Sequence, residues 1–213
     1  MPRQAGRSAQ QTRAIILDAA AEVLARQGYE AARVDDIARR SGVSKGAFYF
    51  HFPSKEEMAL GLVDQLSERL IQKVQRMVEP QPPSRARLGA AIQALLETFA
   101  RKRALGHLLL VNIVGQGRVM DRKFLPIREK FILFIRAELV GAAEAGELPR
   151  DLDLDLTARA WLGALHETIL HWLLAAHPTP LASQGKALQN LLFYGIGRAL
   201  PGCDDKETGR GSP

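Results

Sequence analysis

The sequence predicts an all-α protein with a small N-terminal domain of three helices and a larger antiparallel helical domain behind it. Apolar residues recur at intervals of three and four over most of the 213 residues. No dipeptide typical of a β-hairpin separates two alternating runs, and β-branched residues are sparse. Glycine, proline and serine interrupt the pattern at helix-length intervals, which marks the ends of the individual helices.

The N-terminal part begins with residues 1–10, which we expect to form a flexible basic arm. A first helix is predicted over 11–26, because one face carries apolar residues at helical spacing. These residues are Ile16, Leu17, Ala20, Val23 and Leu24. Gly28 is expected to end this helix.

Two short helices should follow. Residues 34–40 carry Asp35 and Asp36 in their first turn, where the helix dipole favours negative charge. Gly42 breaks this helix, and Ser44 can cap the next one over 45–50 by accepting a hydrogen bond from its free amides. The second short helix should stop before Pro53.

The larger domain should begin with a long helix over 55–77, because Ser54-x-x-Glu57 has the capping-box pattern. The stretch 79–84, rich in proline, is the clearest linker. Further helices are expected over 84–103, 105–113, 122–146, 155–176 and 182–200. The resulting division is an arm (1–10), an N-terminal domain (11–55), a larger domain (56–200) and a disordered tail (201–213).

The positive charge is concentrated near the N-terminus. The whole chain has a net charge of +6, and the residues up to Lys55 hold nine Lys or Arg against five Asp or Glu. A basic end favours a polyanionic partner, with nucleic acid first and acidic lipid second. A basic protein without such a partner is the alternative at this point.

The other bulk features limit the protein class. A single cysteine, Cys203, excludes an intrachain disulfide and fits a reducing compartment. The most apolar stretches, 105–114 and 161–176, are too short or too interrupted to span a bilayer. We therefore expect a cytoplasmic protein without a membrane partner.

The most informative stretch is 33–52, where two short helices are joined by a tight turn at Gly42. Six apolar residues can form one shared core for them. These are Val34, Ile37, Ala38, Val43, Phe48 and Phe52. This pattern is typical of a helix-turn-helix, in which the second helix is held rigidly so that its residues reach base edges in the major groove.

The side chains around this motif suit a groove lined by phosphates. Lys45, His51 and Lys55 supply cations or donors, and Tyr49 supplies a hydroxyl. The predicted DNA-binding residues are Arg33, Val34, Ser44, Lys45, Gly46, Ala47, Tyr49, Phe50, His51 and Lys55. An ordinary helical hairpin with a solvated basic face is the alternative interpretation.

Residues 12–60 resemble the DNA-binding domain of TetR-family transcriptional regulators. The resemblance rests on Thr12-Arg13, Ile16-Leu17, Ala19-Ala20, Gly28-Tyr29, Val34, Asp36-Ile37-Ala38, Gly42-Val43-Ser44-Lys45-Gly46, Phe48-Tyr49, His51-Phe52 and Ser54-Lys55. Two positions depart from the family pattern. Arg33 stands where a capping Thr or Ser is frequent, and Leu24 stands where Phe is frequent.

The resemblance implies properties that the residues alone do not establish. Regulators of this family are all-α homodimers that bind near-palindromic double-stranded DNA operators, with recognition helices about 34–36 Å apart. A small molecule bound in the middle helices changes that separation and releases the DNA. Repression is the usual outcome. We expect no cofactor or metal.

The middle helices are apolar as a set, which favours a small lipophilic effector, although plain core packing is the better explanation for any single residue. The candidate ligand-binding residues are Phe99, Leu109, Ile113, Phe131, Phe134, Leu165, His166 and Ile169. The segment 163–172 resembles a penultimate-helix segment of TetR-type regulators of fatty-acid degradation that sense acyl-CoA. A drug-like or aromatic effector controlling an efflux gene is the main alternative.

The last two helices are candidates for the dimer interface. In a monomer their large apolar residues would have to pack internally or form an exposed patch, which is unusual. The candidate interface residues are Trp161, Trp172, Leu188, Leu191, Leu192 and Ile196.

An enzyme is the least supported alternative. His166-Glu167 invites comparison with a zinc-binding His-Glu-x-x-His helix, but the second histidine is His171, roughly 140° around the helix from the first. The two cannot share a metal ion from one helix face. A helical lipid carrier without DNA binding is a remote alternative that leaves the motif at 33–55 unexplained.

Overall fold

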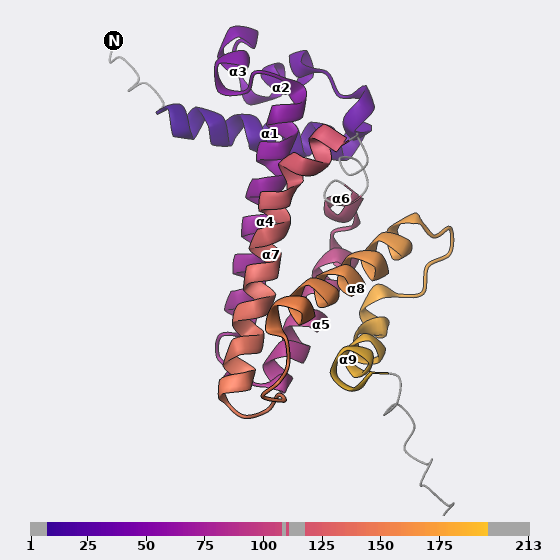
Figure 1. Ribbon diagram of the computed structural model, residues 1–213. Coiled ribbons are helices and arrows are strands. Elements are labelled where there is room, and N and C mark those ends of the chain that lie inside the picture. Colours follow the sequence, from indigo (N-terminus) through magenta and orange to yellow (C-terminus); the bar gives the residue numbers. More distant parts are fainter. Residues whose placement is uncertain (1–7, 108–109, 111–117, 196–213) are drawn as a thin grey trace, which may run out of the picture.

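The computed structural model describes residues 8–107, 110 and 118–195 of the chain, and within these ranges it is helical with no strand. The predicted all-α class is confirmed. Figure 1 shows a small head (α1–α3) at one end of an elongated helical body. The elements are α1 (Ala9–Ala31), α2 (Val34–Ser41), α3 (Lys45–His51), α4 (Lys55–Val78), α5 (Arg85–Arg101), α6 (Arg103–Gly106), α7 (Arg118–Glu144), α8 (Leu154–Leu174), a 3-10 turn η2 (Leu181–Gln184) and α9 (Gly185–Tyr194).

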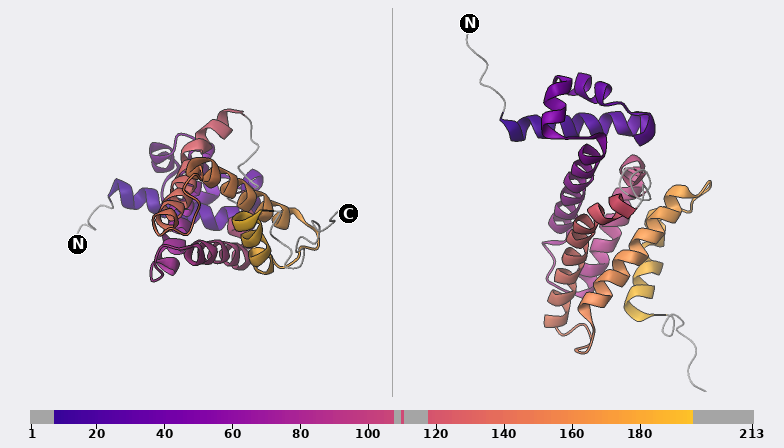
Figure 2. Two further views of the ribbon diagram at one scale, coloured as in Figure 1. Left: turned by 60° about the horizontal axis from the view of Figure 1, so that its bottom comes forward. Right: turned by 45° about the horizontal axis from the view of Figure 1, so that its top comes forward.

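Helix α4 connects the two parts, since it packs on α1 in the head and on α5 and α7 in the body. Helix α7 runs beside α4, and α8 packs across α7. Figure 2 shows α8 and α9 on the same side of the body. Buried apolar side chains form a single core from Ile16 in α1 through Leu62 in α4 to Leu139 in α7, so the head is joined to the body by packing.

The predicted helix caps of the head are confirmed. The Ser44 hydroxyl accepts a hydrogen bond from the amide of Ala47 at 3.1 Å, and Ser54 does the same for Glu57 at 3.2 Å. Gly42 ends α2 with φ 68°, a left-handed conformation that favours glycine. Arg33 makes no side-chain cap for α2, as its departure from the family pattern predicts.

The start of α1 corrects the prediction for the N-terminal arm. The Ser8 hydroxyl accepts from the amide of Gln11, and the Gln11 side chain accepts from the amide of Ser8. This capping box begins the helix at Ala9, so residues 8–10 do not belong to a flexible arm. Gly28 leaves helical geometry with φ 77°, which confirms the predicted interruption there.

Several predicted boundaries in the body also shift. Helix α7 begins at Arg118 rather than at 122. Of the predicted helix over 105–113, the part up to Gly106 belongs to α6, His107 and Leu110 are helical as well, and the other residues lie outside the described ranges. The last predicted helix starts as the turn η2, and α9 ends where Gly195 takes φ 66°. Residues 196–200 of that predicted helix and the predicted tail lie outside the described residues. No helix in the described ranges is both long and apolar enough to cross a bilayer.

Candidate DNA-binding head and ligand cavity

The motif predicted over 33–52 forms a helix-turn-helix. The amide of Val43 donates to the carbonyl of Ala38 at 3.1 Å across the turn. Phe48 is fully buried and fixes α3 against α1 and α2, together with the buried Ile37 and Phe52. Because these buried side chains fix one face of α3, the opposite face is presented to solvent in a defined orientation.

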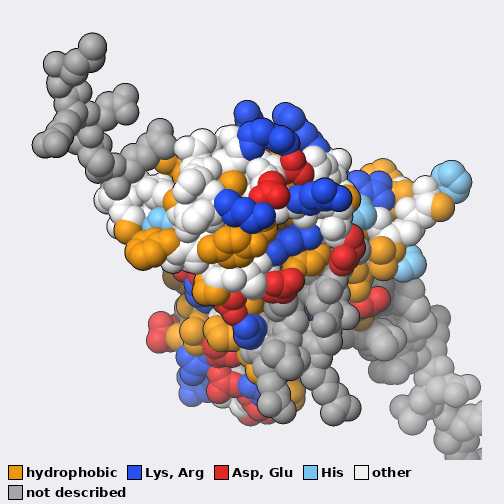
Figure 3. Space-filling model, turned by 90° about the horizontal axis from the view of Figure 1, so that it is seen from above, with side chains coloured by type: hydrophobic (Ala, Val, Ile, Leu, Met, Phe, Trp, Pro, Cys, Tyr) orange, Lys and Arg blue, Asp and Glu red, His pale blue; other side chains and the backbone are white. Residues whose placement is uncertain are grey.

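The exposed face of α3 carries most of the predicted DNA-binding residues. Lys45, Gly46, Tyr49 and Phe50 are exposed, as is Ser44 at the cap, whereas Ala47 and His51 are half-buried. Seen from above, the head presents Lys and Arg side chains interspersed with apolar groups and a few carboxylates (Figure 3). Arg33 is exposed at the start of α2 and Val34 is half-buried beside it.

Lys45 is the cation placed closest to the start of α3. Its ammonium lies 2.9 Å from the carboxylate of Asp35, and this hydrogen bond raises the pKa of Lys45 above its ordinary value. Both side chains are well exposed, at 58% and 65% of their surface. The pair can therefore separate when a phosphate replaces the carboxylate.

Lys55, at the start of α4, contacts the end of α1. Its ammonium donates to the backbone carbonyl of Glu30 at 3.3 Å and lies 4.4 Å from the centre of the Tyr29 ring. These contacts attach the start of α4 to the end of α1. Lys55 thus stabilises the junction of head and body, and its predicted DNA contact stays an untested prediction.

A cavity of about 490 Å³ lies in the body between α4, α5, α7 and α8. Its lining is largely aliphatic and aromatic. The lining residues are Val63, Ser67, Leu95, Phe99, Leu110, Phe124, Leu125, Ile127, Arg128, Phe131, Leu162, Leu165, His166 and Ile169. Its volume is in the range of small-molecule binding sites.

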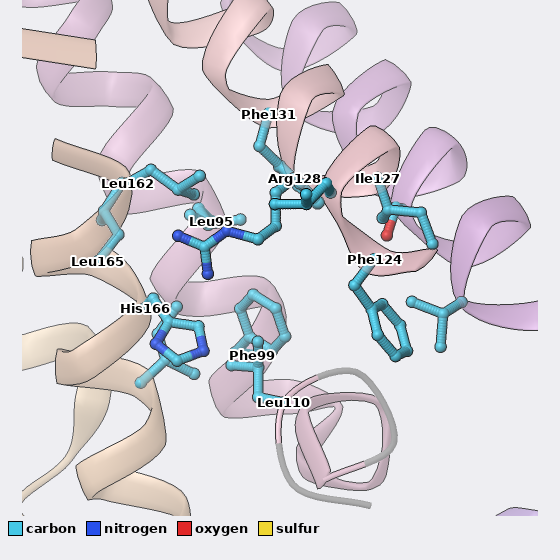
Figure 4. A pocket seen from close by; sticks show the side chains of 14 residues that line it. Leu95, Phe99, Leu110, Phe124, Ile127, Arg128, Phe131, Leu162, Leu165 and His166 are labelled. Carbon is cyan, nitrogen blue, oxygen red and sulfur yellow. The ribbon is translucent and has the colours of Figure 1, made fainter. Parts of the chain in front are cut away.

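Three polar side chains interrupt the apolar lining: Ser67, Arg128 and His166. Figure 4 shows the Arg128 guanidinium reaching from α7 into the cavity on the side of the His166 ring, which comes from α8. Burial, with a smaller effect of the Arg128 charge, lowers the pKa of His166. Within the described part of the chain, no carboxylate forms an ion pair with Arg128. The cavity therefore offers donors to an acceptor group of a ligand.

A smaller apolar recess of about 50 Å³ continues the cavity away from the head. The two share four side chains, Leu95, Phe131, Leu162 and Leu165. The recess extends to Trp161 at its far end.

The predicted ligand-binding residues divide between these spaces. Phe99, Phe131, Leu165, His166 and Ile169 line the cavity, which groups five residues that sequence spacing alone could not assemble. Phe134 lines the recess, and Leu109 and Ile113 lie outside the described residues.

The sequence analysis missed Arg128, the most polar group of the cavity. Arg128 lies three residues before Phe131 and four after Phe124, so the helical spacing that singled out Phe131 also places Arg128 on the same face.

The structure changes the expectation for the dimer interface. Trp161 packs edge-on against Phe193 with ring centres 5.2 Å apart, and Trp172 lies under the Arg103 guanidinium at 4.9 Å. Both tryptophans and Leu188 are buried within the single chain, so they are core residues with little surface for a partner. Leu191 is exposed and Leu192 half-buried, while Ile196 lies outside the described residues.

Charged contacts link α7 to α4 alongside the cavity. The ammonium of Lys130 lies 2.5 Å from the Asp64 carboxylate and 2.6 Å from that of Glu68. Burial opposes the charged form of Lys130, but the two hydrogen bonds outweigh it and raise its pKa. Lys123 pairs with Glu57 nearer the head. Phe124 and Arg128 of α7 line the cavity, so one helix contacts both the cavity and α4.

Comparison with known proteins identifies the head. Residues 16–62 match the family model described as bacterial regulatory proteins, tetR family. The fatty acid metabolism regulator protein of Bacillus subtilis is 23% identical over 181 residues, which cover 85% of this chain and 93% of that protein.

Solved structures extend the similarity to the body. The transcriptional regulator FadR from Bacillus subtilis, in complex with stearoyl-CoA, matches with a TM-score of 0.76 and 23% identity over 86% of this chain and 98% of that one. Thermus thermophilus FadR, a TetR-family transcriptional repressor in complex with lauroyl-CoA, matches with a TM-score of 0.71 and 23% identity. The match covers 94% of this chain and 100% of that one. At this identity the two structures establish a common fold.

Proposed function

We propose that this protein is an operator-binding repressor of the TetR family that is released by a small lipophilic effector, because residues 16–62 match the TetR-family model and the chain shares its fold with two FadR structures. The proposal is carried by the combination of an exposed helix α3 and a ligand-sized cavity. The next helix, α4, forms part of the cavity wall. Operator binding in the cytoplasm, where the DNA is, follows from the same proposal.

Binding of DNA is supported by the charge and exposure of the head. Lys45, Tyr49 and His51 offer donors around α3, and Arg33 lies exposed at the start of α2. Contacts of this kind go mainly to phosphates and fix the register of the protein on the duplex. The exposed apolar Phe50 adds a group that can touch base edges.

Dimerisation is supported by apolar side chains of α8 and α9 that are exposed among the described residues. Leu156 and Leu174 lie on one stripe of α8, eighteen residues apart, and both are more than half exposed. Gly163, at the middle of this stripe, has open space where a side chain would point, which allows a second helix to approach closely. On α9, Leu191 and Tyr194 are exposed. A second copy of the chain would cover this surface and place two heads on a near-palindromic operator.

An acyl-CoA is the effector that we propose. The apolar lining and the deeper recess suit a hydrocarbon chain, and Arg128 and His166 suit the carbonyl or an anionic part of a thioester. Two proteins of the same fold are described in complex with stearoyl-CoA and lauroyl-CoA. A drug-like aromatic ligand is the second candidate, favoured by the rings of Phe99, Phe124 and Phe131 in the cavity wall.

Thermal unfolding against lauroyl-CoA, stearoyl-CoA, the corresponding free acids and a set of aromatic drugs tests the effector. A true ligand stabilises the folded protein by about 2.7 kcal/mol at a hundredfold excess over its Kd. Acyl-CoA stabilisation alone supports the proposal, and stabilisation by the drugs alone replaces it with the second candidate. If no lipophilic compound raises the melting temperature, release by a lipophilic effector is wrong.

Two phenylalanine substitutions localise the binding. Leu162 lies on the cavity wall (Figure 4), so Leu162→Phe should fill part of the cavity and weaken acyl-CoA binding. Leu133→Phe introduces the same ring at an exposed position of α7, outside the cavity lining and the proposed dimer surface, and should leave binding unchanged. Equal effects of both would place the ligand elsewhere.

A further inference from the structure

The outward face of α3 has an unusual composition for a surface that reads DNA. Phe50 is three residues after Ala47 and four after Gly46, so its side chain lies beside both on one side of the helix. None of these side chains carries a hydrogen-bonding group. The middle of the recognition surface therefore has no side-chain donor or acceptor.

The polar groups of this region lie around the apolar face. The Ser44 hydroxyl accepts from the amide of Ala47 at 3.1 Å as the helix cap, and Lys45 pairs with Asp35 at 2.9 Å. Tyr49 rests edge-on against the buried Phe48, with ring centres 5.5 Å apart. These groups surround the apolar centre and are suited to phosphates, which supply affinity without reading sequence.

Phe50 is the most exposed of the large apolar side chains in the described part of the chain, at 81% of its surface. Its ring lies nearly perpendicular to the His51 ring, with centres 5.1 Å apart. Gly46, one turn earlier, has no side chain to cover it, and no neighbour other than the Ser44 hydroxyl comes within 4 Å of where one would begin. An aromatic ring left in water in this way forgoes the free energy that its burial would release.

The edges of the base pairs in the major groove present donors, acceptors and one apolar group, the 5-methyl of thymine. A face without donors or acceptors can distinguish bases there only through that methyl. We propose that Phe50, with Ala47 beside it, reads thymine 5-methyl groups in each half of the operator and is a specificity-determining residue of this protein. The proposal rests on the proposed function, because it requires that α3 enters the major groove.

Replacement of thymine by uracil isolates the methyl group, because the two bases differ in nothing else. An operator is first selected from random duplexes with the full-length protein, and each thymine is then replaced by deoxyuridine in turn. At one or two positions per half-site we expect binding to weaken about fourfold per methyl removed. The dependence of affinity on salt should stay the same, because no phosphate contact is lost.

Two variants connect this loss to Phe50. Phe50→Ala should weaken binding to the thymine operator and abolish the difference between thymine and uracil, whereas Phe50→Leu should keep part of that difference. The exposure of Phe50 means that neither variant should change the melting temperature. Equal binding of thymine and uracil operators by the unmodified protein overturns the inference, as does a Phe50→Ala variant that still distinguishes them. Failure to select any sequence overturns the proposed function itself, which is a separate result.

Discussion

The ammonium of Lys130 lies 2.5 Å from the carboxylate of Asp64 and so joins the helix that lines the cavity to the helix that carries the head. On the cavity side of α7, Arg128 and Phe131 flank Lys130 in sequence and line the ligand space. One short segment of α7 thus contacts both the ligand site and α4. This arrangement connects the cavity to the helix that carries the head.

Replacing Lys130 by Met should weaken the communication between the two sites. Lys130→Met is expected to bind lauroyl-CoA as before, while the ratio of DNA affinities without and with lauroyl-CoA falls several-fold toward one. Fluorescence anisotropy of a labelled operator measures this ratio. Arg136→Met is the matched control, since it removes another exposed ion pair of α7, with Asp155, that does not reach α4. An unchanged ratio in Lys130→Met would show that coupling takes another path.

The Arg87–Glu138 pair should contribute most among the ion pairs to stability. Its side chains are 17% and 9% exposed, and Arg87 also donates to the carbonyl of Gln81 at 2.9 Å. Arg87→Met leaves the Glu138 carboxylate buried without a partner and should cost about 3 kcal/mol in urea denaturation. Arg136→Met should cost about 1 kcal/mol or less because that pair is exposed. If Arg87→Met and Arg136→Met lose similar amounts of unfolding free energy, burial does not decide how much an ion pair contributes to the stability of this protein.

Asp35 should restrain DNA binding through Lys45. Asp35→Asn removes a carboxylate from the DNA-facing surface and frees the Lys45 ammonium, so affinity for an operator should rise about threefold at low salt. Lys45→Ala should weaken binding and reduce the salt slope by about 0.9, the value for one phosphate contact. Asp18→Asn, which alters a carboxylate paired with Arg69 on α4, serves as the control. If Lys45→Ala has the same dependence of affinity on salt as the unmodified protein, Lys45 does not contact a phosphate.

Protonation of His166 should destabilise the folded protein. Burial lowers its pKa below the ordinary value of 6.5, and Arg128 adds to this effect. Between pH 6.5 and the lowered pKa, the unfolded chain binds the proton more readily than the folded chain, so stability falls as the pH falls through this range.

Comparison of urea denaturation at pH 7.5 and pH 5.5 tests this assignment. His166→Leu should lose less stability over the interval than the unmodified protein does. His171→Leu, at an exposed position of the same helix, should lose as much as the unmodified protein. If His166→Leu loses as much stability between pH 7.5 and pH 5.5 as the unmodified protein does, groups other than His166 dominate the pH dependence.

The head could be predicted in detail because its signals are local. Ser44, Ser54 and Gly42 act through the backbone of their own turn, and they occupy the predicted caps and turn. The same kind of signal, Ser8-x-x-Gln11, marks the true start of α1 and was missed. For Lys55 the sequence suggested a cation for DNA, whereas its partner, the carbonyl of Glu30, is brought near only by the packing of α4 on α1.

The cavity and the interface depend on long-range packing and were only partly predictable. Helical spacing marks Trp161 and Leu191 alike as apolar, but it does not say which one meets another helix of the same chain. The structure buries Trp161 against Phe193 and leaves Leu191 exposed. Arg128 could not be predicted for a related reason. An arginine is normally exposed, and Arg128 lines the cavity only because α8 packs over that part of α7.

Specific, salt-sensitive binding to an operator tests the central claim most directly. The measurement is a gel shift at two salt concentrations with excess competitor DNA, on the DNA upstream of the gene for this protein and on sites selected from a random pool. If the protein binds an operator and is released by an acyl-CoA, we expect a discrete band that resists the competitor and weakens steeply with salt. The band should disappear when lauroyl-CoA or another acyl-CoA is added. Folded, dimeric protein that gives no competitor-resistant band on either kind of DNA would contradict it.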